Sequence, residues 1–159
     1  MIRLICSGSI ARAFSAEQLA DFLEITRLRN QHEGICGVMV LMELDFLQII
    51  EGPDDEVDRL FEEQRKNSPR NSIMLLSRQP IEQAIFAAWS LGFIKTPAFG
   101  ETPSEEDNQM LLDIEQIDPQ DPSARHSLRI LREFVAGKWH LHVSGGNSAI
   151  VVRRGTGWS

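Results

Sequence analysis

The chain has 159 residues, of which 42% are hydrophobic and 25% are charged, and its formal net charge is −7 at pH 7. This balance is typical of a globular protein of one ordinary domain, or of a small domain with an extension. The negative charge argues against a nucleic-acid-binding surface, and no apolar run approaches the roughly 20 residues that span a bilayer.

The first residues lack the charged and then apolar pattern of a secretory signal, because Arg3 interrupts the run. Two cysteines, Cys6 and Cys36, are too few for a disulfide framework or a zinc site. We therefore expect a cytoplasmic protein with two reduced thiols, no metal, and no membrane or nucleic-acid partner.

The chain begins with a predicted strand at residues 2–6, where polarity alternates. Ser15 and Gln18 have the spacing of a capping box, which predicts a helix that begins there and ends before Gly34. Two apolar runs on either side of residues 42–45 then predict a β-hairpin.

Pro53 precedes an acidic first turn, which predicts a second helix. Residues 73–77 and 86–94 are expected to form a fourth and a fifth strand. The order β-α-β-β-α-β-β over residues 1–97 predicts an α+β, ferredoxin-like sandwich with both helices on one face of the sheet. Residues 46–50 are apolar on both parities, so the second face of the sheet also needs a cover.

Residues 98–159 are expected to form an extension that supplies this cover. Thr102 and Glu105 have capping-box spacing, and Asp121 is placed to cap a further helix. Residues 138–154 are compatible with a β-hairpin or with an arm that pairs with another chain. Within this segment, the His140 and His142 pair is expected to lie on a solvated strand face rather than to bind zinc.

Gln48 is the first candidate functional residue. Strand parity places it on the same face as Phe46 and Ile50, where an amide must find partners or cost a few kcal/mol. The parity predicts that Gln48 faces the helices. The alternative is that this face is partly open and that Gln48 is solvated or bonded to backbone.

Five stretches together, in order and with similar spacing, resemble the BLUF domain, an FAD-binding blue-light sensor. They are "RLICSGS", "LADFLEITRLRNQHEGICG", "DFLQIIEGPDDEVDRLF", "PRN" and "FAAWSLGF". The resemblance implies the same sandwich, with FAD between the two helices and often further helices on the opposite sheet face. It also implies a mechanism in which a tyrosine on the first strand gives the excited flavin an electron and a proton, and a glutamine on the third strand then rearranges its hydrogen bonds.

By position, the resemblance implies five flavin-site residues in this chain. The glutamine is Gln48, but Cys6 stands in place of the tyrosine, and the chain has no tyrosine at all. The asparagine pair at the end of the first helix is Arg29 and Asn30, so only the second is kept. On the fifth strand Trp89 is kept, whereas the methionine two places later is a leucine.

These departures predict that the flavin site is degenerate. Cys6 is several ångströms shorter than tyrosine, so it should not reach Gln48, and a neutral thiol is a poor electron donor. Arg29 lacks the paired donor and acceptor of asparagine. Glu63 and Gln64 replace an Arg-Ile pair of the second helix, so Glu63 would place negative charge near an anionic diphosphate.

We therefore expect no bound cofactor and a regulatory or scaffolding module that acts through protein–protein contacts. We expect it to form a homo-oligomer with the C-terminal hairpin or its tryptophans, Trp139 and Trp158, at the contact. The alternative is a divergent FAD-binding sensor of light or redox state that uses Cys6 and Trp89, with FAD retained. An enzyme is not expected, because no nucleophile is accompanied by a credible base.

Overall fold

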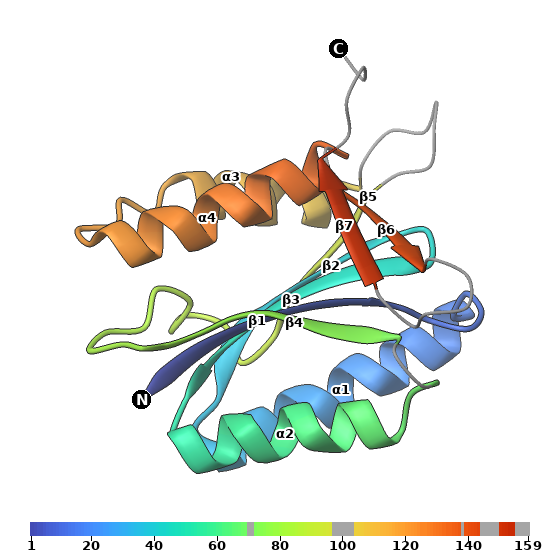
Figure 1. Ribbon diagram of the computed structural model, residues 1–159, viewed down its shortest axis with the longest axis horizontal. Helices are drawn as coiled ribbons and strands as arrows, with labels where there is room; N and C mark the ends of the chain where they lie inside the picture. Colours follow the sequence, from blue (N-terminus) through green and yellow to red (C-terminus); the bar gives the residue numbers. More distant parts are fainter. Residues whose placement is uncertain (70–71, 97–103, 138, 144–149, 155–159) are drawn as a thin grey trace.

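The computed structural model describes residues 1–69, 72–96, 104–137, 139–143 and 150–154, the last two ranges as backbone only. A five-stranded sheet lies between two layers of helices (Figure 1). Its strand order is β4-β1-β3-β2-β5, and only β2 and β5 pair in parallel. The strands are β1 (Ile2–Ser9), β2 (Cys36–Met42), β3 (Asp45–Gly52), β4 (Ile73–Pro80) and β5 (Gly92–Thr96).

Two helices, α1 (Ala16–Glu33) and α2 (Asp54–Lys66), cover one face of the sheet. The α1 boundaries follow from local chemistry. Ser15 accepts a hydrogen bond from the Gln18 amide in a complete capping box, and Gly34 ends the helix at φ 71°, a left-handed conformation that glycine adopts without strain. The predicted start and end of this helix are confirmed.

Two further helices, α3 (Glu105–Glu115) and α4 (Pro122–Val135), cover the opposite face (Figure 1). The Asp121 carboxylate caps α4 as expected, accepting a hydrogen bond from the Ala124 amide at 2.9 Å. The predicted cap of α3 is corrected, because Ser104 performs that role and accepts from the Asp107 amide at 3.1 Å. Thr102 lies outside the described residues.

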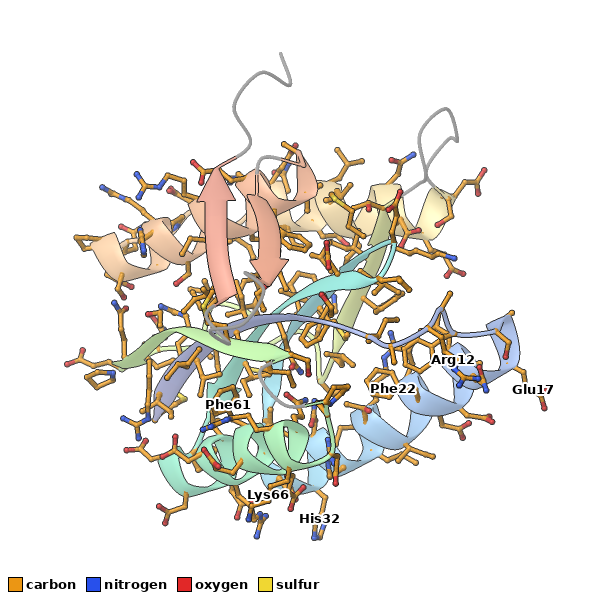
Figure 2. All side chains as sticks on the ribbon, turned by 45° about the vertical axis from the view of Figure 1, so that its right-hand side comes forward. Arg12, Glu17, Phe22, His32, Phe61 and Lys66 are labelled. Carbon is orange, nitrogen blue, oxygen red and sulfur yellow. The ribbon has the colours of Figure 1, made fainter. Side chains whose placement is uncertain are left out.

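The central strands bury both of their faces, as the double apolar parity predicts. On the α1–α2 side, the core includes Leu4, Ile50 and Leu60. On the α3–α4 side, it includes Ile49 and Leu128. Figure 2 shows Phe22 and Phe61 extending from α1 and α2 toward the sheet, whereas His32 and Lys66 extend away from it. This arrangement is the expected α+β sandwich with C-terminal helices on the second face.

The fifth strand is shorter than predicted. Residues 86–91 form turns, and pairing with β2 begins only at Gly92, opposite Val38. The apolar side chains of this segment pack without a strand ladder, with Phe86 in the α3–α4 core and Leu91 in the α1–α2 core. Hydrophobic alternation alone therefore did not distinguish a packed loop from a strand.

A separate two-stranded antiparallel sheet follows α4, made of β6 (Trp139–Val143) and β7 (Ile150–Arg154). The hairpin alternative for this segment is thus confirmed for the backbone. The side chains of Trp139, His140 and His142, and all of Trp158, lie outside the described residues. None of the described helices is long and apolar enough to cross a membrane.

Candidate functional site

A cavity of about 340 Å³ lies between the sheet and the pair α1 and α2. Gln48 of β3 lies at its floor, and this side chain is only 2% exposed. The prediction that Gln48 faces the helices is confirmed. The lining residues are Ile10, Phe14, Phe22, Ile25, Thr26, Arg29, Met39, Phe46, Gln48, Leu60, Glu63, Gln64, Asn67, Ser68 and Ile73.

Cys6 lies directly opposite Gln48 in the β1–β3 register, at a point where the pairing of β1 with β4 shifts by one residue. Its Sγ is 3.8 Å from Gln48 Oε1, within the range of a long thiol hydrogen bond. The expectation that Cys6 does not reach the amide is therefore wrong, because strand register brings the two Cα positions together.

Burial determines the charge of this thiol. Cys6 has no exposed surface, and the cost of placing a thiolate there raises its pKa to about 12. At neutral pH the side chain is therefore an uncharged thiol. It can donate a weak hydrogen bond to Gln48, but it is a weak nucleophile and a weak electron donor.

On α1, Arg29 and Asn30 face different surroundings. Arg29 lines the cavity, and its Nη1 is 4.0 Å from Glu63 Oε2 on α2. Asn30 is fully buried, and its Nδ2 donates to the Ser90 carbonyl at 2.7 Å. Asn30 is not among the described residues that line the cavity. Its hydrogen bond to Ser90 instead joins α1 to the segment before β5.

Several buried polar atoms near the cavity lack partners among the described residues. Gln64 Oε1 and Arg29 Nε are buried without a hydrogen bond. The Gln48 amide makes one hydrogen bond within the same part of the chain, the long one from Cys6. Unpaired buried polar groups cost free energy, so Arg29 and Gln64 each carry an unfavourable polar atom beside the cavity.

Trp89 lies on the other side of the sheet from the cavity. Its ring centroid is 6.5 Å from that of Phe86, and it packs against the α3–α4 core. Its amide donates to the Phe86 carbonyl, and its carbonyl accepts from the Gly37 amide at 3.0 Å. The structure therefore brings Cys6, Gln48 and Arg29 to the cavity region and places Trp89 in the opposite layer.

A buried ion pair beneath α4 was missed from the sequence. Arg3 and Glu51 are 1% and 0% exposed, and Arg3 Nε donates to Glu51 Oε2 at 3.0 Å. Glu51 also accepts from the Phe86 amide at 2.8 Å, while Arg3 contacts Ser123 Oγ of α4 at 3.4 Å. The available signal was that each of two mostly apolar strands carries one charged residue, of opposite sign, within its apolar run.

No group of three or more metal-ligating side chains occurs in the described residues. The chemistry of the site is thus that of a partly open, mostly apolar cavity with a glutamine at its floor. The profile of the BLUF family, described as sensors of blue light using FAD, matches residues 1–92.

The chain is a member of the BLUF family.

Curated relatives agree over a short segment. The photoactivated adenylate cyclase subunit alpha of Euglena gracilis is 29% identical over 77 residues, which are 48% of this chain but 8% of that protein. A cyclase subunit alpha-like protein, FB, of the same organism is 29% identical over 76 residues, again 8% of its length. This BLUF chain therefore spans a small part of the relatives it matches.

Solved structures show the same fold. BlrB, a BLUF protein in its dark state, has a TM-score of 0.59 at 24% identity, with 86% of this chain and 96% of that chain covered. BlrP1 of Klebsiella pneumoniae, with FMN and cyclic diGMP, has a TM-score of 0.67 at 18% identity, with 90% and 41% covered. At these identities, the BLUF fold is what the likeness establishes.

Proposed function

We propose that this BLUF domain is a regulatory module that acts through protein–protein contacts and has lost both FAD binding and the photocycle. The observation that supports the proposal most directly is the buried contact between Cys6 and Gln48. A thiol with a pKa of about 12 is protonated at physiological pH, and a neutral thiol does not replace a phenol as electron donor.

Loss of FAD binding is supported by the charges at the cavity. Arg29 is the single cation among the described lining residues, and Glu63 on α2 faces it at 4.0 Å. A diphosphate would have to separate this pair and would leave the Glu63 carboxylate unpaired beside it. The ring portion of FAD meets apolar walls and Gln48, but the described lining residues offer the diphosphate no cation other than Arg29, which already pairs with Glu63.

The test is to titrate FAD into the purified protein, follow quenching of flavin fluorescence, and illuminate the mixture with blue light. We expect a colourless protein, weak binding and no light-induced shift of absorption. Cys6→Tyr alone should restore neither colour nor a light response, because the tyrosine serves the photochemistry rather than the binding. Stoichiometric micromolar binding with a reversible red shift would contradict the proposal.

A second candidate function is a divergent flavin sensor, and the retained cavity favours it. The space and the buried Gln48 amide are still present between α1 and α2. This candidate predicts FAD bound at purification and a reversible spectral change on illumination or reduction. It also predicts that Gln48→Leu removes that change while Trp89→Phe leaves FAD bound, since Trp89 packs in the opposite layer.

The contacts that would transmit a signal are proposed to lie in residues 98–159, beyond the BLUF-like unit of residues 1–97. The β6–β7 hairpin forms a two-stranded sheet of its own, and isolated hairpins of this kind are marginally stable in water. We propose that its edge pairs with a second copy of the chain. Light scattering at tens of micromolar should report a homo-oligomer, and a monomer would contradict this assembly.

A further inference from the structure

The outer face of α4 is basic, although the chain as a whole is acidic. We infer that this face binds the outer face of α1 in a second copy, with the two helices parallel, so that copies join head to tail. The contact uses neither the cavity beneath α1 and α2 nor the C-terminal hairpin. It adds a second, defined surface to the proposed role in protein–protein contact.

Arg125, Arg129 and Arg132 form a basic stripe on α4. Spacings of four and three residues place them on one side of the helix, and all three side chains are exposed. None of the ion pairs formed by the described residues involves them. Residues 122–159 contain six arginines and lysines and one acidic residue, whereas the whole chain has a net charge of −7. This asymmetry favours an anionic partner for α4.

Glu17, Asp21 and Glu24 form an acidic stripe on α1 with the same spacing. All three are exposed, and within the part of the chain that the structure describes they also take part in no ion pair. Leu28 continues the stripe by one turn and is 61% exposed although it is apolar. The outer face of α1 therefore presents three carboxylates and then a leucine along one line.

The two stripes match residue for residue when the helices are parallel. Each acidic residue then lies opposite one arginine, with Asp21 and Arg129 as the central pair. In the same alignment Leu28 lies opposite Ala136, at the C-terminal end of α4. Opposite charges at facing positions select the partner and the orientation of paired helices.

A cavity between α3 and α4 lies where this alignment places Leu28. Its volume is about 270 Å³, and Arg132 and Ala136 line it at the end of the basic stripe. Ile114 and Val135 are among its apolar lining residues. Leu28 of a second copy can fill part of this space, and burying an exposed leucine is favourable. The charged and the apolar features of both helices thus agree on one register.

The antiparallel orientation of the two helices is disfavoured. It would place Leu28 at the N-terminal end of α4, beside Asp121, and would bring Glu17 toward the cavity. Glu115 also lines that cavity, so Glu17 would meet a like charge there. Parallel pairing avoids both conflicts.

The contact joins different copies, because α1 and α4 lie in opposite layers of one molecule (Figure 1). It is heterologous, so each copy can bind one neighbour through α1 and another through α4. A contact between two exposed helices is smaller than a standard interface, which corresponds to a dissociation constant of roughly 0.1–1 mM. At tens of micromolar, where the hairpin contact is tested, this second contact therefore contributes little.

Sedimentation equilibrium of the full chain up to about 1 mM tests the contact. The average mass should rise above its value at tens of micromolar. Raising the salt concentration from about 0.05 M to about 0.5 M should weaken this further association about tenfold, because salt screens exposed charges. Asp21→Arg with Glu24→Arg should abolish the rise in mass, and so should Arg129→Glu with Arg132→Glu, because each change places like charges opposite each other.

Mixing these two reversed variants should restore the rise in mass, because the basic α1 of one then faces the acidic α4 of the other. Lys66→Glu with Lys95→Glu is the matched control. It changes the net charge by the same amount as the α4 reversal, at two exposed lysines outside both stripes. The control should associate like the wild type, and circular dichroism checks the fold of every variant.

Leu28→Gln tests the orientation, because only the parallel pairing places this side chain at the cavity between α3 and α4. The variant should weaken the association about fivefold. Leu44→Gln is its control, since Leu44 is 41% exposed in the turn between β2 and β3, away from both helices. That variant should leave the association unchanged.

A mass that does not rise with concentration at low salt overturns the inference, and so does a mixture of reversed variants that associates no better than either alone. An equal effect of the two leucine substitutions overturns the parallel register. Binding of the wild type to phosphatidylcholine vesicles that contain phosphatidylserine, without self-association, would assign the basic stripe to a membrane surface and also overturn it. A monomer at tens of micromolar instead contradicts the proposed hairpin contact, whatever happens at higher concentration, so the two failures are distinguishable.

Discussion

Cys6 is enclosed on every side, and that enclosure gives it a measurable effect on stability. Its folded pKa is raised to about 12 by burial, whereas a thiol in an unfolded chain ionises near pH 8.5. The unfolded state therefore releases its proton first as the pH rises. The contribution of the buried Cys6 thiol to stability is therefore complete below about pH 8.5 and is lost progressively toward pH 12.

We predict that the free energy of unfolding falls by about 1 kcal/mol more in the wild type than in Cys6→Ala between pH 8.5 and 9.5. The reason is that alanine removes the titrating group while other ionisable groups stay. Urea unfolding at the two pH values measures the difference. Equal pH dependence in both proteins would show that the thiol is not buried in the folded state.

The Arg3–Glu51 pair is a second residue-scale feature with a clear expected cost. Arg3→Met should lower the free energy of unfolding by about 3–5 kcal/mol, because Glu51 would remain as a buried unpaired charge. Arg3→Met combined with Glu51→Gln should cost less than the sum of the single changes. Chemical denaturation of the three variants gives the coupling energy.

The matched control for this pair is Arg78 and Asp58, which are joined by two hydrogen bonds of 2.9 and 2.8 Å but are exposed. Arg78→Met should lower stability far less, since solvent screens an exposed pair. A loss as large as that of Arg3→Met would mean that burial is not what makes the Arg3–Glu51 pair important.

At the scale of the element, β3 contributes side chains to both cores, the one under α1 and α2 and the one under α3 and α4. Gln48 and Ile50 face the cavity layer, while Ile49 and Glu51 face α4 and the segment before β5. A shift of β3 by one residue would exchange these two sets and bury Gln48 among the C-terminal helices. The register of this one strand therefore positions both the cavity and the ion pair.

Two glycines show how closely the elements approach. A Cβ on Gly37 would be 2.1 Å from the Ile49 carbonyl oxygen, and a Cβ on Gly92 would be 2.0 Å from Met110 Cε of α3. We predict that Gly37→Ala is the more destabilising, by about 3 kcal/mol or more, because backbone cannot move aside. Gly92→Ala should cost about 1–2 kcal/mol, because a methionine end can shift.

Met110→Ala combined with Gly92→Ala tests the cause. If the clash with the Met110 side chain is what destabilises Gly92→Ala, the added alanine should cost less in the Met110→Ala background than in the wild type. Denaturant midpoints of the four proteins give the comparison. Equal costs in both backgrounds would assign the effect of Gly92→Ala to the backbone of β5 instead.

The limits of sequence-based prediction also lie at this scale. The ends of α1 and the orientation of Gln48 were predictable, because a capping box and strand parity act locally. The start of β5 was not, since residues 86–91 pack their apolar side chains as a loop. The Arg3–Glu51 pair and the Cys6–Gln48 contact were missed because they depend on which residues face each other across paired strands.

For the molecule as a whole, the α3–α4 layer is the cover that the sheet requires. Val38, Val40, Leu47, Ile49 and Ile94 are each no more than 1% exposed beneath it. Removing the layer would expose a contiguous apolar face, which is rare in monomeric proteins. The extension is therefore expected to be part of the folding unit rather than a dispensable tail.

We predict that a fragment ending at residue 97 aggregates, because this apolar face loses its cover. A chain ending at residue 137 keeps α3 and α4 and should stay dispersed, but as a monomer if the hairpin forms the proposed contact between copies. Size-exclusion chromatography with light scattering distinguishes the two. A dispersed, monomeric fragment 1–97 of unchanged stability would contradict the predicted role of the extension.

The absence of tyrosine gives this protein an unusually simple emission spectrum. Its near-ultraviolet fluorescence comes from Trp89, Trp139 and Trp158, without any contribution from tyrosine. Trp89 packs beside Phe86 against the α3–α4 core, and its backbone is bonded to Gly37 at the start of β2. If Trp139 and Trp158 are replaced by phenylalanine, Trp89 is the single remaining tryptophan. Its emission maximum would then report whether the C-terminal helices are packed on the sheet. A red shift on adding a partner protein would then mark the release of that layer, with no label attached to the chain.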